Sequence, residues 1–341
     1  MKAMMITEVK PVGRNTLPLA AADLPVPVPE GDEILIRVSA CGVCHTELDE
    51  IEGRTPPPDL PVIPGHQVVG TVVDTGEDAA LHRPGDRVGA AWIFSSCGEC
   101  AYCTTGDDNL CPEFLATGRD RNGGYAEYML ARDSYVYPIP SVFSDAEAAP
   151  LLCAGAIGLR SLRLSNLSDG GALGLTGFGA SGHLVLKTAL HLYPQSHIYV
   201  FARSEAEREF AESLGAIWTG DTGDTPPAQL DAIIDTTPVW KPVVEALKNL
   251  APGGRLVINA IRKEEADKDY LLKLDYARDL WMEKEIKSVA NVSRRDAADF
   301  LKIAAEINLR PEIEEYPLED ANEALIQLKE GRIRGAKVLK L

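Results

Sequence analysis

The spacing of apolar and polar positions changes midway along the chain. Up to about residue 150, short runs of strand-forming residues are separated by proline and glycine, as at residues 33–39, 68–73, 87–91 and 125–130. Runs of this kind, bounded by turn formers, are typical of strands joined by long loops. The pattern predicts an irregular β-rich domain in this part of the chain.

From about residue 155, apolar strands alternate with amphipathic helices. Residues 172–176 and 198–201 form short apolar runs, and each precedes a segment with helical spacing, residues 181–191 and the segment that begins at Ser204. The same order of strand, helix and strand continues to residue 258. Strands that alternate with helices of this length predict a doubly wound parallel sheet, so the predicted fold class is α/β.

The C-terminal part of the chain adds a helical pattern at residues 295–306 and an apolar run at residues 336–341. We expect both segments to rejoin the first domain. The sequence therefore predicts one discontinuous domain, residues 1–153 and 292–341, and a second domain, residues 154–291. A length of 341 residues agrees with two domains.

The chain is acidic, with 34 Lys and Arg residues against 51 Asp and Glu residues and a net charge of −17. Such a charge repels phosphate backbones and anionic membranes, so we expect neither a nucleic-acid partner nor a membrane partner. The N-terminus lacks the apolar core of a signal peptide. The longest uncharged stretch, residues 170–186, falls short of the ~20 residues of a membrane span. These features predict a cytoplasmic protein.

Four of the seven cysteines are crowded into one short segment. Cys97, Cys100, Cys103 and Cys111 have a spacing with which four thiolates can close a tetrahedron around Zn²⁺. Four protein ligands leave no open position, which is typical of a structural zinc site. In a cytoplasmic protein the crowding favours metal over the alternative, buried or disulfide-bonded cysteines.

A glycine-rich turn, GFGASG at residues 177–182, lies between the first strand and the first helix of the α/β segment. The motif alone often marks only a tight turn. In this context glycines allow the turn, a close approach of a pyrophosphate and helix–strand packing, while the helix N-terminus offers unpaired N–H groups. The turn therefore predicts a dinucleotide site. Its candidate residues are Gly177, Gly179, Ala180, Ser181 and Gly182.

The end of the second strand bears on the choice of cofactor. Sites for NAD place an acidic residue about 20 residues after the turn, where it bonds the ribose 2′-hydroxyl. Here the strand ends in Arg203 and Ser204, which can pair with, and donate to, a 2′-phosphate. We therefore predict NADP(H) in preference to NAD(H). The alternative is that Arg203 is a solvated charge and that Glu205 or Glu207 serves NAD.

Three further candidate ligands stand far apart in the sequence. Cys44 lies in the run CGVCHT, His66 precedes the strand pattern at residues 68–73, and Cys153 lies in an apolar stretch. Taken singly, His66 is typical of an ordinary loop residue and Cys153 of core packing. Cys41 and Cys44 cannot complete a metal site without distant partners.

Taken together, these segments resemble the zinc-dependent alcohol dehydrogenases of the medium-chain dehydrogenase/reductase superfamily. The supporting runs are GVCHT at 42–46, PGH at 64–66 with Gly70, PGDRV at 84–88, the four-cysteine segment, GGYAEY at 123–128, Cys153 and the glycine turn. The resemblance covers nearly the whole chain. It implies a GroES-like catalytic domain, with a zinc lobe at about residues 95–112, and a Rossmann domain for the cofactor.

The resemblance also implies roles for individual residues. It makes Cys44, His66 and Cys153 the ligands of an open catalytic zinc, so that each subunit holds two zinc ions. Zinc would stabilise the alkoxide while hydride passes between a primary or secondary alcohol and NADP(H) or NAD(H). The other implied roles are a proton relay through Thr46, orientation of His66 by Glu47, contact of His45 with the pyrophosphate, and substrate contacts by Trp92 and Ile93.

Three positions depart from the family pattern. Gln67 replaces the glutamate that usually follows the ligand histidine, and an amide cannot supply that negative charge. Asp49 stands where the proton relay commonly ends in histidine, and the lower intrinsic pKa of a carboxyl group shifts the pH profile of activity. Ala336 aligns with an arginine directed at the pyrophosphate, for which Arg334 or Lys337 is the candidate substitute.

Two alternatives to this interpretation remain open. One is a zinc-free quinone or enoyl reductase on the same scaffold, although such proteins lack the cysteine lobe and the Cys, His and Cys ligands. The other is a non-enzymatic zinc ribbon that binds a partner. The favoured prediction is an alcohol dehydrogenase or aldehyde reductase that acts on a small molecule and assembles as a homodimer or homotetramer.

Overall fold

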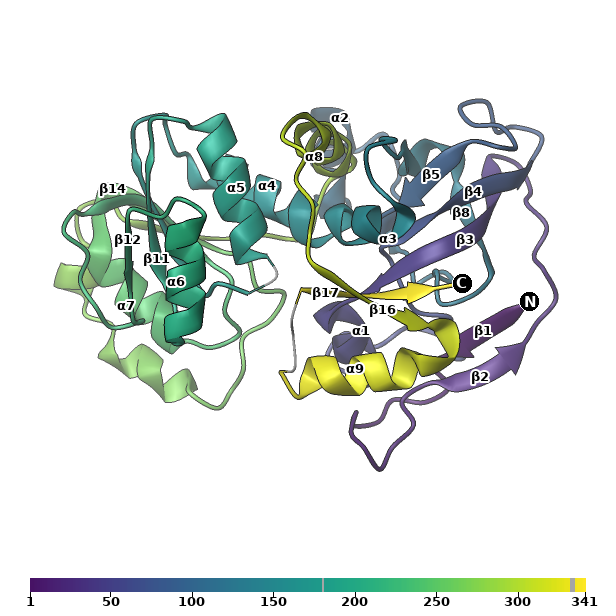
Figure 1. Cartoon of the computed structure of the whole chain (residues 1–341), viewed down its shortest axis with the longest axis horizontal. Helices are drawn as coiled ribbons and strands as arrows, with labels where there is room; N and C mark the ends of the chain where they lie inside the picture. The colour runs from purple at the N-terminus through teal and green to yellow at the C-terminus, as the bar shows by residue number, and fades with distance from the viewer. Residues whose placement is uncertain (180, 332–334) are drawn as a thin grey trace. The chain divides into compact units, whose positions relative to one another are not determined.

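The computed structural model describes residues 1–179, 181–331 and 335–341 (Figure 1). Within these residues the chain forms two compact units. The first unit consists of Met1–Ala156 and Val292–Leu341, and the second is Ile157–Asn291. Helix α4 (Ala154–Ser165) begins in the first unit and continues into the second.

A mixed sheet is the framework of the first unit. Its strands lie in the order β16-β17-β3-β4-β5-β9, and β8 also pairs with β3. The strands are β3 (Glu33–Val43), β4 (Val68–Thr75), β5 (Arg87–Ala90), β8 (Tyr128–Arg132), β9 (Val136–Pro138), β16 (Ile313–Pro317) and β17 (Ala336–Lys340). Because β17 pairs antiparallel with β3, with Leu339 opposite Cys41, the C-terminal segment is part of the same sheet as the N-terminal segment.

Smaller elements complete the first unit. Two short ladders join β1 (Lys2–Met5) to β2 (Ala20–Asp23) and β6 (Ile93–Ser95) to β7 (Leu115–Ala116). The helices are α1 (His45–Ile51), α2 (Ala101–Thr105), α3 (Asp145–Ala148), α8 (Arg294–Glu306) and α9 (Ala321–Lys329), with shorter turns η1 (Asp108–Leu110), η2 (Asp133–Tyr135), η3 (Ala149–Leu152) and η6 (Leu318–Asp320). Leu48 of α1 and Leu325 of α9 are buried in the same core as Ile34 and Ile36 of β3, which fixes α1 against the sheet.

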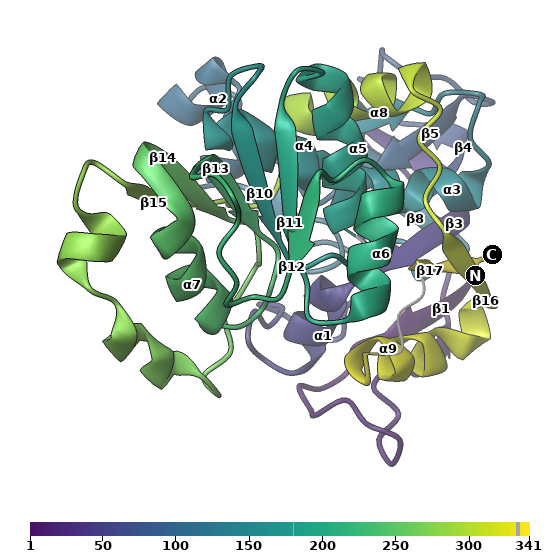
Figure 2. The same ribbon diagram turned by 60° about the vertical axis from the view of Figure 1, so that its left-hand side comes forward.

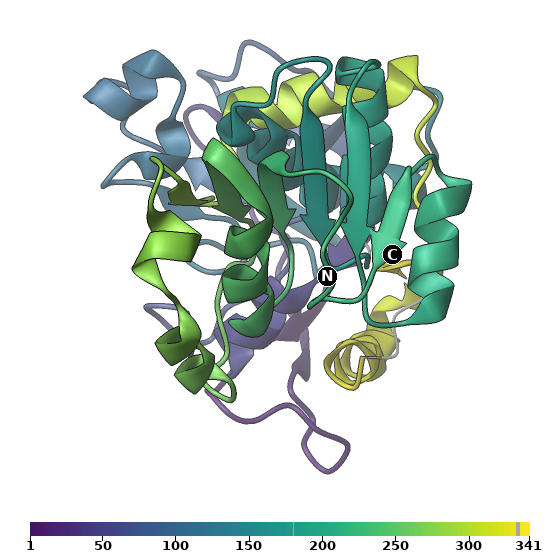
Figure 3. The same cartoon turned by 90° about the vertical axis from the view of Figure 1, so that its left-hand side faces the viewer.

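The second unit is built on a parallel sheet (Figure 2; Figure 3). Its strands lie in the order β12-β11-β10-β13-β14-β15, and every neighbouring pair is parallel. The elements are β10 (Ala172–Thr176), α5 (Gly182–Leu192), β11 (His197–Phe201), α6 (Glu205–Ser213), β12 (Trp218–Gly220), β13 (Leu230–Asp235), α7 (Lys241–Asn249), β14 (Leu250–Ile258), η4 (Lys268–Lys273), η5 (Tyr276–Leu280) and β15 (Glu285–Ser288). From β10 the chain first builds β11 and β12 on one side and then β13 to β15 on the other, which confirms the predicted doubly wound α/β fold.

Helices cover both faces of this sheet, because successive strand residues point to opposite faces. Ile234 of β13 packs in one core with residues of α5 and α6, including Val185 and Ala211. The neighbouring Ile233 packs in another core with Leu247 of α7. Figure 2 shows α5 and α6 on one side of the strands and α7 on the other. None of the helices in the described part of the chain is long and apolar enough to cross a membrane.

Candidate active site

The first turn of α1 fixes the side chain of Cys44. Cys44 caps the helix: its Sγ accepts a hydrogen bond from the Thr46 N–H at 3.3 Å, and its own N–H donates to Glu47 Oε2 at 2.8 Å. Reciprocal bonds of this kind satisfy backbone donors that a helix start otherwise leaves unpaired. The cysteine and the glutamate therefore have fixed positions directly after β3.

The second oxygen of Glu47 orients His66. Glu47 Oε1 lies 2.7 Å from His66 Nδ1, and the side chains of both residues are buried. A carboxylate at Nδ1 favours the tautomer that carries its proton there, which leaves the Nε2 lone pair available to a metal. Nε2 lies 3.7 Å from Cys44 Sγ, and the ring of Trp92 contacts the imidazole edge-on with centroids 5.1 Å apart.

The loop that carries His66 is supported by the GGYAEY segment. The N–H groups of Gly124 and Tyr125 donate to the carbonyl oxygens of Gly65 and Pro64 at 2.9 and 3.0 Å. Gly65 has a φ of +101°, and a Cβ at this position would collide with the ring of Tyr125. Glycine is therefore required where the chain turns into His66.

Cys153 completes a group of three ligand atoms. It lies between η3 and α4, and its Sγ, Cys44 Sγ and His66 Nε2 all lie within 4.8 Å of one another. A tetrahedral zinc with Zn–S of about 2.3 Å and Zn–N of about 2.05 Å separates a sulfur and a nitrogen ligand by roughly 3.6 Å. The distance of 3.7 Å between Cys44 Sγ and His66 Nε2 matches this separation, and the three side chains, all in the first unit, carry donor atoms that zinc takes.

The surroundings of Cys44 disfavour a bare thiolate at this position. The adjacent Cys153 thiol, burial and the Glu47 carboxylate all raise the pKa of Cys44 well above its usual value. A doubly charged ion reverses this effect, because it stabilises coordinated thiolates directly. Cys41, the neighbouring cysteine, is fully buried in β3, and burial raises the pKa of its thiol.

The four-cysteine lobe is a second, separate group. The Sγ atoms of Cys97 and Cys111, and those of Cys100 and Cys103, lie 3.6 Å apart. Tetrahedral Zn–S bonds of about 2.3 Å place sulfur atoms roughly 3.8 Å apart, so four ligands fit one ion. The backbone N–H groups of Glu99 and Cys100 lower the pKa of Cys97 to about 7, which favours the thiolate.

The other predicted catalytic and substrate residues differ in their exposure. Thr46, Asp49, Gln67, Trp92 and Ile93 are buried, whereas His45 is exposed. The Asp49 carboxylate accepts a hydrogen bond from Arg54 Nε at 2.6 Å. The Gln67 side chain lies against Gly42, where an added Cβ would come within 2.6 Å of its Oε1. Ile93 packs with Trp92 in a small apolar cluster.

Glu50 of α1 is a buried carboxylate that no sequence pattern predicts. This residue is 1% exposed, and neither carboxylate oxygen has a hydrogen-bond partner among the described residues. Burial, and next the Glu47 charge, raise the pKa of Glu50 well above its usual value. No sequence signal distinguishes it, because Glu47, Asp49, Glu50 and Glu52 together have the composition of a solvated helix face.

In the second unit, the three glycines of the turn have different surroundings. Gly177 has a φ of +81°, a Cβ on Gly179 would meet nothing within 4 Å, and a Cβ on Gly182 would approach Gly177 O to 2.9 Å. Gly177 thus lies in a tight turn, Gly179 faces open space, and Gly182 allows close packing of the helix against the turn. Ser181 precedes α5, and its carbonyl accepts from the Val185 N–H at 3.0 Å. Ala180 lies outside the described residues.

Two arginines lie beyond the carboxyl end of β11, Arg203 directly after the strand and Arg208 in α6. Arg203 is exposed, and Arg208 donates from Nη1 to the carbonyl oxygens of Ala202 and Arg203 at 2.8 and 3.0 Å. The Ser204 hydroxyl caps α6 and accepts from the Glu207 N–H at 3.1 Å, and Glu207 reaches back to the Ser204 N–H. Arg208 was missed because its position at the strand end depends on how α6 begins.

Of the two candidate substitutes for the C-terminal arginine, Lys337 and Arg334, only Lys337 lies in the described part of the chain. The ammonium of Lys337 is buried and donates to Glu314 Oε2, Tyr316 Oη and Gln327 Oε1 at 2.7, 2.7 and 2.9 Å. Three acceptors occupy its three donors, so Lys337 is a structural residue rather than a phosphate ligand. Arg334 lies outside the described residues.

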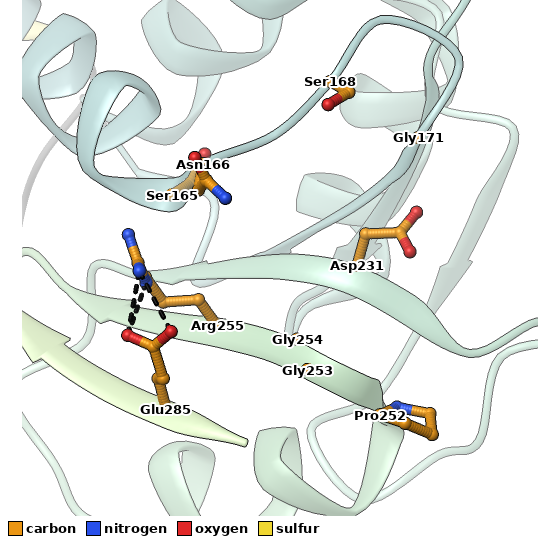
Figure 4. Close-up of a pocket in the computed structure, with 10 residues that line it drawn as sticks. All are labelled: Ser165, Asn166, Ser168, Gly171, Asp231, Pro252, Gly253, Gly254, Arg255 and Glu285. Carbon is orange, nitrogen blue, oxygen red and sulfur yellow. Dashed lines mark hydrogen bonds and ion pairs between the residues drawn. The ribbon is translucent and has the colours of Figure 1, made fainter. Parts of the chain in front are cut away.

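A pocket of about 300 Å³ lies at the amino edge of the parallel sheet (Figure 4). Arg255 and Glu285, which are opposite each other on β14 and β15, form a two-bond ion pair in its lining, and Asp231 accepts from the Ala172 N–H at 2.8 Å. Its lining residues are Ser165, Asn166, Ser168, Gly171, Asp231, Pro252, Gly253, Gly254, Arg255 and Glu285. Because ligands of doubly wound sheets bind at the carboxyl ends of the strands, we do not assign the cofactor to this pocket.

A Cys, His and Cys group suited to zinc, together with a doubly wound sheet that carries a glycine turn, is typical of a zinc-dependent oxidoreductase. The alcohol dehydrogenase GroES-like domain family matches residues 30–141, and the zinc-binding dehydrogenase family matches residues 209–339. The chain belongs to the alcohol dehydrogenases of the medium-chain dehydrogenase/reductase superfamily, as the resemblance predicted. It is therefore an enzyme that acts on CH–OH groups, built from a GroES-like and a Rossmann-type domain.

Similar proteins support this assignment over the whole chain. A probable alcohol dehydrogenase AdhA of Mycobacterium tuberculosis is 42% identical over 97% of this chain and 95% of its own length. An alcohol dehydrogenase of Geobacillus stearothermophilus is 33% identical over 100% of this chain and 99% of its own. Among solved structures, an NAD-dependent alcohol dehydrogenase has a TM-score of 0.87 at 26% identity, with full coverage of both chains.

Proposed function

We propose that this alcohol dehydrogenase binds two zinc ions per subunit and transfers hydride between NADP(H) and a primary or secondary alcohol or the corresponding aldehyde or ketone. The observation that carries the proposal is the group formed by Cys44, His66 and Cys153, whose ligand atoms lie within 4.8 Å of one another. Three protein ligands leave the fourth position of a tetrahedral zinc open, as catalysis requires.

The chain's own residues have distinct roles in this proposal. Cys44, His66 and Cys153 hold the catalytic ion, and Glu47 orients His66 through the contact of 2.7 Å. Zinc, when bound, supplies a Lewis acid that stabilises negative charge on the substrate oxygen. Thr46 passes the proton from the substrate hydroxyl towards Asp49. Trp92 and Ile93 line the substrate pocket. Gln67 adds no charge beside the metal ligand His66.

Cofactor choice follows from the charges at the end of β11. Arg203 is exposed and Arg208 is held against the carbonyl oxygens of the strand end, so two cations are available to a 2′-phosphate. The carboxylate of Glu207 is bonded to the backbone of Ser204, which disfavours the alternative in which Glu207 serves NAD. These contacts support a preference for NADP(H).

The cofactor proposal is tested by kcat/KM for NADPH and NADH in the wild type and two variants. Arg203→Ala should lower kcat/KM for NADPH at least tenfold and leave NADH within twofold. Lys302→Ala, which removes an exposed cation from α8 in the other unit, is the charge-matched control and should change neither. A tenfold preference of the wild type for NADH would contradict the proposal.

The zinc and substrate proposals are tested together by metal quantification and a substrate screen. We expect close to two zinc ions per subunit, and turnover of aliphatic, branched or aromatic alcohols and aldehydes measured in both directions. Fully active protein without metal would instead support a zinc-free reductase. We also propose a cytoplasmic homodimer or homotetramer, which light scattering on the purified enzyme checks.

A further inference from the structure

A buried ion pair lies at the carboxyl edge of the parallel sheet, where the strand order reverses. Asp235 is the last residue of β13, Thr176 is the last residue of β10, and the two are directly opposite in the parallel register. Lys263 follows the neighbouring strand β14. Ligands of doubly wound sheets bind at this edge, in the crevice between the two strands from which the chain winds in opposite directions.

The ammonium of Lys263 is bonded to three acceptors. It forms a close ion pair with Asp235 Oδ2 and donates to the carbonyl oxygens of Thr237 and Val239 at 2.7 and 3.1 Å. The side chain of Lys263 is 8% exposed and that of Asp235 is fully buried. The other carboxylate oxygen accepts from the hydroxyls of Thr176 and Thr237 at 2.6 and 2.8 Å. One lysine thus ties the segment of residues 236–239 to the end of β13.

That segment is in turn the support of the glycine turn. The N–H and the hydroxyl of Thr236 both donate to Thr176 O at 3.0 Å. A Cβ on Gly177 would approach Thr236 Oγ1 to 2.8 Å and Thr237 Cγ2 to 2.9 Å. A displacement of residues 236–239 would therefore alter the surface beside the first glycine of the turn.

We propose that Lys263 is a positioning residue for the cofactor, and that it fixes residues 236–239 in the conformation that accepts the nicotinamide half of the dinucleotide. The inference rests on the proposed function, because it assumes that the glycine turn binds NADP(H). Arg203 and Ser204 follow β11, on one side of β10, and in the proposed function they bind the adenosine half. Residues 236–239 and Lys263 lie on the β13 and β14 side, where the other half must extend.

Two variants separate positioning from simple stabilisation. Lys263→Met leaves Asp235 buried and unpaired, which is strongly destabilising. The double variant Lys263→Met with Asp235→Asn removes both charges and avoids that penalty, but residues 237 and 239 still lose their tether. Lys268→Met is the matched control, because Lys268 follows the same strand and forms an exposed pair with Glu265 at 2.9 Å.

Binding is measured by calorimetry with NADPH and with adenosine 2′,5′-bisphosphate, which carries only the adenosine half; NADH and ADP are measured in parallel. The double variant should bind NADPH at least tenfold more weakly than the wild type, and the bisphosphate within twofold. KM for NADPH should rise by a similar factor. Equal loss for the whole dinucleotide and the fragment, or unchanged NADPH binding by the folded double variant, would overturn the role of Lys263. If the wild type bound none of the four probes, the proposed function itself would be contradicted.

Discussion

The two cysteine-containing groups of the first unit are assembled in opposite ways. The four cysteines of the lobe lie within one short segment, Cys97 to Cys111, and three of them are partly exposed. The other group takes Cys44, His66 and Cys153 from three distant segments and surrounds them with buried residues. In the proposed function the four ligands of the lobe close a structural site, whereas three ligands leave a coordination position for substrate. The number of protein ligands, four against three, distinguishes the two proposed sites.

The largest expected effect separates the two groups by activity. Cys44→Ser should lower kcat/KM by roughly a thousandfold, since loss of a Lewis acid costs several kcal/mol of transition-state stabilisation. Zinc content should fall from about two to about one per subunit, which metal analysis measures beside the kinetics. Retention of full activity by this variant would show that the three-ligand group is not catalytic.

A smaller loss is expected at the carboxylate that links two of the ligands. Glu47→Gln keeps the size of the side chain but removes the charge that faces His66 Nδ1, so activity or zinc affinity should fall about 10- to 100-fold. Glu50→Gln is the matched control, because Glu50 is equally buried but forms no hydrogen bond to a ligand residue. Equal effects of the two variants on kcat/KM would reject the orienting role of Glu47.

The lobe should respond to ligand loss in stability rather than in turnover. Cys100→Ser removes one of four sulfur ligands, and structural zinc sites contribute directly to folding energy. We expect one zinc ion to be lost and Tm to fall by about 5 °C or more, equivalent to roughly 2 kcal/mol. The kcat/KM of the folded fraction should change less than threefold. A thousandfold loss of kcat/KM at unchanged Tm would reverse the assignment of the two sites.

The smallest effect concerns the dependence of stability on pH. The pKa of Glu50 is raised by burial, so above its ordinary value of 4.5 the unfolded chain loses a proton that the folded chain retains. The stabilisation from this proton is complete below that pH and is lost as pH rises towards the folded-state pKa, by at most about 1.4 kcal/mol per pH unit. Glu50→Gln cannot ionise, so its advantage over the wild type in urea unfolding should grow between pH 5 and pH 8.

Glu52 provides a control of opposite sign. Burial acts to raise its pKa, but hydrogen bonds from Lys329 and from the Val12 N–H hold it below the usual value. Its contribution to stability is therefore present above pH 4.5 and lost as pH falls through the lowered pKa. Glu52→Gln should be less stable than the wild type at pH 7. A Glu50→Gln advantage that stays constant across the pH range would contradict the burial argument.

How far the sequence predicts the molecule depends on the range of the interactions. Residues 172–176 are β10 as predicted, because an apolar run before a glycine turn is a local signal. The strand predicted at residues 125–130 lies further along the chain, because β8 is Tyr128–Arg132. The Tyr125 N–H donates to the carbonyl oxygen of Pro64 instead of to a neighbouring strand. Edge strand β15 was missed because all of its residues are exposed, so no apolar alternation marks it.

The candidate site follows the same rule. The spacing of the four cysteines in the sequence is enough to predict that their sulfur atoms lie close together. Cys44, His66 and Cys153 were grouped only through a family resemblance, because contacts between separate segments of the chain, such as Cys44 with Cys153, leave no local pattern. Glu50, Arg208 and Lys263 were not predicted at all, since their importance depends on burial and on neighbours supplied by the fold.

The most direct test of the central claim is anomalous diffraction at the zinc absorption edge from crystals of active enzyme. The account predicts two peaks per subunit, one among the four cysteines of the lobe and one between Cys44 Sγ, His66 Nε2 and Cys153 Sγ. A single peak in the lobe, with those three atoms too far apart to share an ion, would contradict it.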